Sequence, residues 1–205
     1  MKFRRHGDAP TAASRSLAWA ALALLVAVVP AFQGCLPMVV AAGVGAGALV
    51  ATDRRSTGAQ VDDETIEVKI TTGINNRWGD KVHVNVTSYN AVVLLTGEVP
   101  DAKVRNDVLT LANTTDRVHS VQNEIVVAVP TDMSQRTNDS YITSKVKARF
   151  VEANKFSATH VKVVTERGVV YLMGLVNRSE AASAAQIAAT TTGVTRVVKV
   201  FEYIN

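Results

Sequence analysis

The stretch HVNVTSYNAVVLLTGEV, residues 83–99, decides the fold of this chain. Two alternating, β-branched segments, 82–88 and 91–99, flank a Tyr89-Asn90 turn. Alternation on both sides of a short turn predicts a β-hairpin with one face buried. The segment recurs as HVKVVTERGVVYLMGLV at 160–176, with eight of the 17 positions identical and an Arg167-Gly168 turn. The chain therefore carries two copies of one folding unit.

The repeat extends to the N-terminal side of both hairpins. DDETIEVKITTGI, from residue 62, matches NDSYITSKVKARF, from residue 138. The shared apolar positions are Ile66, Ile70 and Ile74 in the first copy, and Ile142, Val146 and Phe150 in the second. Because they recur every fourth residue, they predict one face of a helix in each copy. Asp63 and Asp139, near the predicted helix starts, are residues of the type that caps a helix.

The repeat also extends to the C-terminal side. A second helix is predicted to begin near Asp101 in the first copy and near Ser179 in the second. A β-branched strand then closes the copies at 119–128 and 195–204. The order αββαβ predicts an α+β fold of two tandem domains, each with a three-stranded sheet packed on two helices.

The N-terminal segment has the layout of a bacterial secretory signal. Arg4, Arg5 and Arg15 belong to a positive leader, and the uncharged apolar run LAWAALALLVAVV follows at 17–29. Its 13 residues are short for a membrane span, which needs roughly 20. We therefore expect a secretory signal, the alternative being an uncleaved signal anchor.

Cys35 is the only cysteine of the chain and directly follows Gly34. A single thiol cannot close an intramolecular disulfide. The surrounding sequence resembles the lipobox of bacterial lipoproteins, which implies acylation at Cys35 and cleavage before it. Leu36 stands where an aspartate would favour retention in the inner membrane, so the resemblance implies an outer-membrane anchor facing the periplasm. Two or more acyl chains give stable anchoring.

These observations divide the chain into five predicted segments. They are a lipoprotein signal peptide at 1–34, a lipidated flexible tether at 35–61, a first domain at 62–128, a linker at 129–137 and a second domain at 138–205. The tether is assigned from its Gly- and Ala-rich composition, which behaves as a flexible coil. It would leave the folded part free to touch its own membrane.

This organisation resembles the dual BON-domain outer-membrane lipoproteins. The resemblance is carried by LLTGEV and YLMGLV, which contain Gly97 and Gly174, and by SYITSKVKARF at 140–150. It implies that the first helix of the second domain binds anionic phospholipid such as phosphatidylglycerol or cardiolipin. It also implies a role in envelope integrity at the division site and a connection with the outer-membrane barrel-assembly machinery.

The two copies differ in charge, which points to different partners. Residues 62–128 carry six Lys and Arg against ten Asp and Glu, a net charge of −4, whereas residues 138–205 carry nine against five, a net charge of +4. An anionic surface would attract only the second copy.

The predicted first helix of the second copy has an outer face suited to a lipid surface. Opposite its apolar stripe lie Tyr141, Ser144, Ala148 and Val151, flanked by Lys145 and Lys147. Exposed apolar groups bordered by positive charge are typical of interfacial helices. In the first copy the matching positions are Thr65, Val68, Thr72 and Asn75, with Glu64 and Glu67 nearby. We therefore predict phospholipid binding at the second copy, the alternative being that this face packs against the first domain.

Motifs for catalysis, metal binding or nucleic-acid binding are absent from the sequence. No histidine among His6, His83, His119 and His160 stands in a metal-ligand spacing, so we assign them structural roles. Acidic pairs such as Asp62-Asp63 are interpreted as charge at a helix N-terminus. A periplasmic location and an aromatic content of 5% argue against nucleic acid. We expect a binding module without cofactor, metal or enzymatic activity, the alternative being an adaptor that docks envelope or barrel-assembly proteins without recognising lipid.

Overall fold

A computed structural model describes residues 53–205 of the chain. The predicted signal peptide, Cys35 and the predicted tether up to residue 52 lie outside the described residues. No helix within 53–205 combines the length and the apolar character that crossing a membrane requires.

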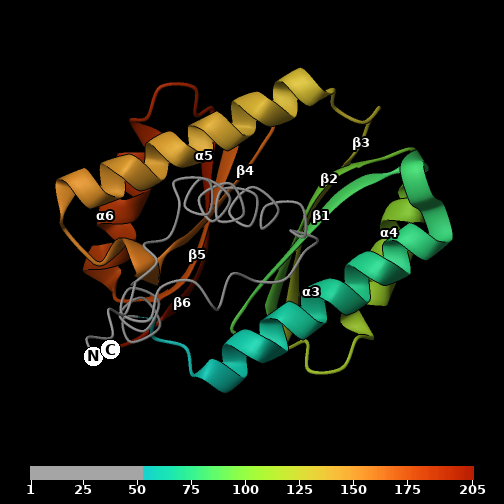
Figure 1. The fold of residues 1–205 in the computed structure, drawn as a ribbon, viewed down its shortest axis with the longest axis horizontal. Coiled ribbons are helices and arrows are strands. Elements are labelled where there is room, and N and C mark those ends of the chain that lie inside the picture. Colours follow the sequence, from blue (N-terminus) through green and yellow to red (C-terminus); the bar gives the residue numbers. More distant parts are fainter. Residues whose placement is uncertain (1–52) are drawn as a thin grey trace, which may run out of the picture. The chain divides into compact units, whose positions relative to one another are not determined.

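The two copies form the predicted αββαβ domains in succession (Figure 1). The first domain consists of α3 (Thr57–Trp78), β1 (His83–Tyr89), β2 (Val92–Val99), α4 (Ala102–Asn113) and β3 (Ser120–Val127). The second consists of α5 (Met133–Ala153), β4 (Lys162–Glu166), β5 (Val169–Val176), α6 (Arg178–Ala189) and β6 (Arg196–Tyr203). Short 3-10 turns, Gly79–Lys81 and Ala158–His160, precede the hairpins. The predicted α+β fold is confirmed.

Each domain has a mixed three-stranded sheet with the second strand of the hairpin in the middle. The orders are β1-β2-β3 and β4-β5-β6, with an antiparallel hairpin and a parallel third strand in both sheets. Alternate residues of β2 face opposite sides: Val93 and Leu95 join the core under the helices, whereas Leu94 belongs to a separate cluster. The sheets therefore bury both of their faces, which explains the nearly continuous apolar run of the central strands.

The second face of each sheet meets the other domain. One apolar cluster contains residues of both copies: Tyr89, Leu94, Tyr171, Met173 and Leu175. Both domains belong to one compact unit.

The hairpin turns are tight and are held by a carboxylate from the first helix of the same domain. Asn90 and Ala91 both have positive φ, 51° and 63°, so the turn lies one residue later than predicted. Their backbone N–H groups donate to Asp63, each at 2.8 Å. In the second domain Asp139 accepts from the predicted Arg167-Gly168 turn, again at 2.8 Å.

This arrangement corrects the capping prediction for Asp63 and Asp139. The helix N-caps are Ser56 and Asp132, whose side chains accept backbone N–H bonds of the first turn. Both helices thus begin upstream of the predicted domain starts. Asp63 is buried within α3 and fixes the hairpin, so it does not serve as charge at a helix N-terminus.

Gly97 and Gly174 allow the backbone of the hairpin to approach itself closely. A Cβ at Gly97 would lie 2.0 Å from the carbonyl oxygen of His83, and one at Gly174 would lie 2.3 Å from that of His160. Only Gly97 has a left-handed φ, 110°. A side chain at either position would collide with the backbone carbonyl of the histidine that precedes or begins the neighbouring strand.

Candidate functional site

The residues predicted to contact lipid all lie on α5. Tyr141 is 62% exposed and Val151 is 68% exposed. Ser144, Lys147 and Ala148 are also exposed, and Lys145 is half-buried. Within residues 53–205, Tyr141 and Val151 therefore do not pack against the first domain, which was the alternative.

The opposite face of α5 fixes the rotation of the helix. Ile142, Val146 and Phe150 are essentially fully buried in the core of the second domain, and the Phe150 ring meets the Phe156 ring edge-on at 5.0 Å. Because side chains three and four residues apart share a face, burying this stripe turns the Tyr141 and Val151 stripe outward.

The two predicted lysines differ in their surroundings. The ammonium of Lys145 donates to the carbonyl oxygen of Thr192 at 2.6 Å and lies 4.6 Å from the centre of the Tyr141 ring. These contacts hold a positive charge against the exposed aromatic ring. Lys147 has no hydrogen bond or ion pair within residues 53–205, so its ammonium is available to an anion.

Met133 extends the exposed apolar stripe and was missed by the sequence analysis. It is the first residue of α5 and is 72% exposed. It precedes Tyr141 by eight residues, which places both on one side of the helix. Residues 129–137 were predicted to be a linker because the segment is short and polar. Asp132, a residue type that caps helices, was the signal that could have predicted the start of the helix.

The corresponding helix of the first domain offers a different surface. Val68 is exposed on the outer side of α3, with Glu64 exposed beside it. Glu67 instead accepts from the backbone of Ser88 at 2.7 Å and from Lys162 of the second domain at 2.9 Å. The outer side of α3 therefore carries an exposed glutamate, and its second glutamate takes part in a contact between the domains.

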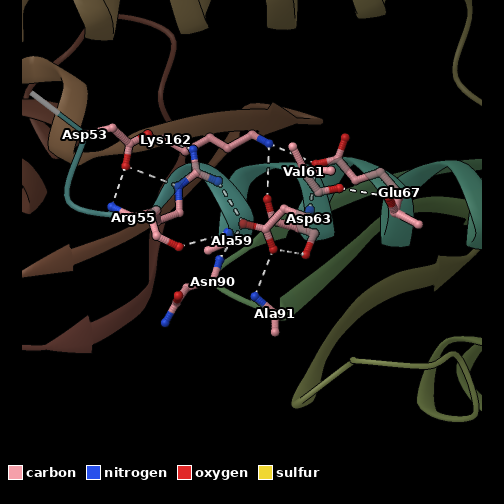
Figure 2. A network of polar contacts seen from close by, with 12 residues as sticks. Asp53, Arg55, Ala59, Val61, Asp63, Glu67, Asn90, Ala91 and Lys162 are labelled. Atoms are coloured by element: carbon pink, nitrogen blue, oxygen red, sulfur yellow. Dashed lines mark hydrogen bonds and ion pairs between the residues drawn. The ribbon is translucent and has the colours of Figure 1, made fainter. Parts of the chain in front are cut away.

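Residues 53–55 connect the two domains and were also missed by the sequence analysis. The Arg54 guanidinium makes two bonds to the Glu180 carboxylate, at 2.6 and 2.8 Å, and one to the carbonyl of Leu175 at 2.8 Å. Figure 2 shows the neighbouring Arg55 between Asp53 and Asp63 of the first domain. The predicted tether is therefore bound to protein at its end, and α3 begins within it at Thr57.

Among the groups that residues 53–55 contact, the carboxyl of Glu180 has the largest shift in pKa. The hydrogen bonds from Arg54 lower the pKa of the Glu180 carboxyl from its ordinary value of 4.5 to about 2, against the opposing effect of burial. Arg55 contributes a second contact, its guanidinium lying 4.0 Å from the centre of the Tyr89 ring. One short segment thus holds groups of both domains.

The fold and the charges together define a class: a two-domain α+β protein with one acidic and one basic copy of the same unit. Comparison with known proteins identifies the family. Residues 62–129 and 138–205 each match the BON domain, and the chain belongs to the BON-domain family.

Relatives of the same organisation extend this assignment. The chain is 40% identical over 186 residues to "Outer membrane lipoprotein DolP" of Haemophilus influenzae, covering 90% of this chain and 96% of that protein. It is 34% identical over 155 residues to "21 kDa hemolysin" of Actinobacillus pleuropneumoniae, covering 75% and 80%. It is 28% identical over 156 residues to "Osmotically-inducible protein Y" of Escherichia coli, covering 74% and 78%. The chain is an outer-membrane lipoprotein with two BON domains.

Proposed function

We propose that the protein binds anionic phospholipid at the periplasmic face of the outer membrane through the outer face of α5. One observation carries the proposal: Tyr141 and Val151 are 62% and 68% exposed on a helix of the positively charged domain. Large exposed apolar side chains, next to a lysine that has no hydrogen bond or ion pair among residues 53–205, suit the headgroup region of a bilayer. Met133 and Ala148 enlarge the surface along the same helix.

The energies are modest and fit a tethered protein. Each Lys near an anionic leaflet contributes about 1 kcal/mol, and an inserted aromatic ring adds an amount of the same order. A total of about 4 kcal/mol corresponds to a dissociation constant of about 1 mM. Acyl chains at Cys35 would hold the domain at a local concentration on the order of millimolar, at which weak contact suffices.

The wider role follows from this contact. The protein would recognise phosphatidylglycerol or cardiolipin, remain anchored through Cys35 and support envelope integrity, with enrichment at the division site and contact with the barrel-assembly machinery. The mode of action is binding and not catalysis, in keeping with the relatives, whose names describe a lipoprotein, a hemolysin and an osmotically inducible protein. These finer statements rest on the family resemblance.

Vesicle flotation of the compact unit, residues 47–205, tests the proposal without interference from the lipid anchor. We expect flotation with phosphatidylglycerol vesicles at low salt and none with phosphatidylcholine vesicles. Lys147→Glu replaces an attraction with a repulsion, about 2 kcal/mol in all, and should weaken binding about 30-fold. Tyr141→Ser should weaken it about fivefold.

Matched substitutions on α3 separate a specific site from general charge. Lys69→Glu makes the same change of charge in the first domain, and Val68→Ser removes an exposed apolar side chain there. Both should leave flotation unchanged. If the wild-type fragment does not float with phosphatidylglycerol vesicles at low salt, lipid recognition is rejected. The alternative function, an adaptor that docks envelope proteins, is then favoured.

A further inference from the structure

Three side chains capable of binding a metal ion meet where the first sheet faces the second domain. His83 begins β1 and lies opposite Glu98 of β2, while Glu166 ends β4 of the second domain. One ligand atom from each lies within 4.8 Å of the other two. His83 Nε2 lies 3.8 Å from Glu166 Oε1.

Each carboxylate is held through one of its two oxygens. Oε2 of Glu166 accepts from the Asn85 amide at 2.7 Å and from the Thr96 hydroxyl at 3.3 Å. Oε2 of Glu98 accepts from the backbone N–H and the hydroxyl of Thr131, at 3.1 and 3.3 Å. Neutral donors of this kind orient metal-binding carboxylates in known sites.

The other oxygen of each carboxylate makes longer contacts with residues of the described part of the chain. Oε1 of Glu98 lies 3.4 Å from the guanidinium of Arg167, and Oε1 of Glu166 lies 3.8 Å from His83. His83 Nε2 has one further neighbour, the amide of Asn85 at 3.4 Å. Two oxygens and one imidazole nitrogen therefore converge without a short hydrogen bond among them.

The surroundings make this convergence costly unless a cation is present. Glu98 is fully buried and Glu166 is 5% exposed, so two carboxylates from different domains approach each other away from water. Arg167 offsets part of this charge through an ion pair with Glu98 at 3.4 Å, from a side chain that is 42% exposed, and leaves Glu166 without an arginine or lysine partner among residues 53–205. A cavity of about 350 Å³, lined by His83, Asn85 and Glu166 among others, opens onto the cluster and provides an entry path.

The BON fold does not require the two glutamates, because both copies keep the histidine but each carboxylate occurs in only one of them. The positions equivalent to His83 and Glu98 are His160 and Leu175, and the position equivalent to Glu166 in the first copy is Tyr89. His160 lies 3.5 Å from Glu180, the carboxylate that Arg54 also binds. The His-Glu-Glu cluster is a particular feature of one end of the contact between the domains.

We propose that His83, Glu98 and Glu166 bind a Zn²⁺ ion that joins the two BON domains. A mixed set of imidazole nitrogen and carboxylate oxygens suits zinc, whereas Mg²⁺ and Ca²⁺ prefer oxygen ligands alone. Zinc–ligand bonds of about 2.1 Å in a tetrahedron separate the ligand atoms by about 3.4 Å, close to the 3.8 Å between His83 and Glu166. A water molecule from the cavity would complete the tetrahedron.

This proposal differs from the structural role expected for His83 and from the expectation that the chain binds no metal. Since its ligands come from both domains, zinc stabilises the docked arrangement by mass action. The sequence could not reveal it, because Glu98 and Glu166 are separated by 68 positions and belong to different copies.

Zinc binding to the full-length protein tests the proposal. The untagged lipoprotein, purified in detergent and stripped of metal with a chelator, is dialysed against Zn²⁺, and the bound zinc is measured by elemental analysis. We expect one zinc per chain, and at least about tenfold weaker binding in His83→Ala and in Glu166→Gln, which keeps the size of the side chain. His160→Ala is the matched control and should bind like the wild type.

A second measurement keeps the test valid if a variant is less stable. Zinc should raise the unfolding temperature of the wild type and of His160→Ala but not that of His83→Ala, and Mg²⁺ should raise none of them. Absence of bound zinc at 100-fold excess overturns the proposal, as does equal loss of zinc in His160→Ala.

Discussion

Replacement of Asp63 by Asn tests how the hairpin of the first domain is held. The Asp63 carboxylate is buried and accepts four bonds: from the Ser88 hydroxyl at 2.6 Å, from the N–H groups of Asn90 and Ala91 at 2.8 Å, and from the Arg55 guanidinium at 2.8 Å. An asparagine has the same size but only one accepting oxygen. Its amide group would face donors that it cannot satisfy.

The expected cost follows from the lost bonds. Hydrogen bonds to a charged group contribute about 1.5–3 kcal/mol each, and at least two of the four are lost. Asp63→Asn should therefore destabilise the protein by about 3–6 kcal/mol, which for a unit of this size lowers the unfolding temperature by about 10 °C. Asp139 accepts two backbone N–H bonds at the second turn, and Asp139→Asn should cost about half as much.

Urea unfolding of residues 47–205, followed by circular dichroism, measures both variants. A larger loss in Asp63→Asn than in Asp139→Asn is the expected order. A loss below about 1 kcal/mol for Asp63→Asn would contradict the reasoning, because the carboxylate would then contribute no more than a surface side chain.

Three further predictions concern the fold and the contact between the domains. Gly97→Ala should destabilise by at least about 3 kcal/mol and more than Gly174→Ala, since only Gly97 combines the backbone collision with a left-handed φ. Arg54 holds the pKa of Glu180 at about 2, so this pair stabilises the protein fully above pH 4.5 and loses its effect as the pH falls from 4.5 to 2. Leu94→Ala, in the cluster shared by the domains, should cost about 2–5 kcal/mol in thermal unfolding.

Each of these has its own check. Equal stability of the two glycine variants in urea would show that φ at Gly97 contributes nothing. Acid titration of Glu180→Gln should give a flatter loss of stability between pH 4.5 and 2, and a profile parallel to the wild type would contradict the assignment of Arg54. Val68→Ala, at an exposed position, is the control for Leu94→Ala and should cost less than about 0.5 kcal/mol.

Local periodicity predicted the fold because each element buries one repeating face. The stripe of Ile142, Val146 and Phe150 sufficed to place Tyr141 and Val151 on the outside of α5, since a helix has a fixed 3.6-residue period. The hairpin was predicted for the same reason, with an error of one residue at the first turn. That error arose because Ala91 adopts a positive φ that its residue type does not favour.

Contacts between distant segments could not be predicted in the same way. Asp63 was interpreted as helix-terminal charge because its partners, Asn90 and Ala91, lie in another element. Arg54 forms an ion pair with Glu180, 126 positions away in the sequence, and no local pattern predicts such a pair. The role of a charged residue depends on the groups that surround it in the fold. The periodicity of apolar residues carries no information about those groups.

The most direct test of the central claim is the depth of α5 in a bilayer. Tyr141→Trp and its first-domain counterpart Thr65→Trp, in residues 47–205, are mixed with phosphatidylglycerol vesicles that contain brominated acyl chains, and quenching is corrected for that of Trp78 in the parent unit. The account predicts strong quenching of the tryptophan at 141 and none of the one at 65. Equal quenching at the two positions, or none at 141, would contradict it.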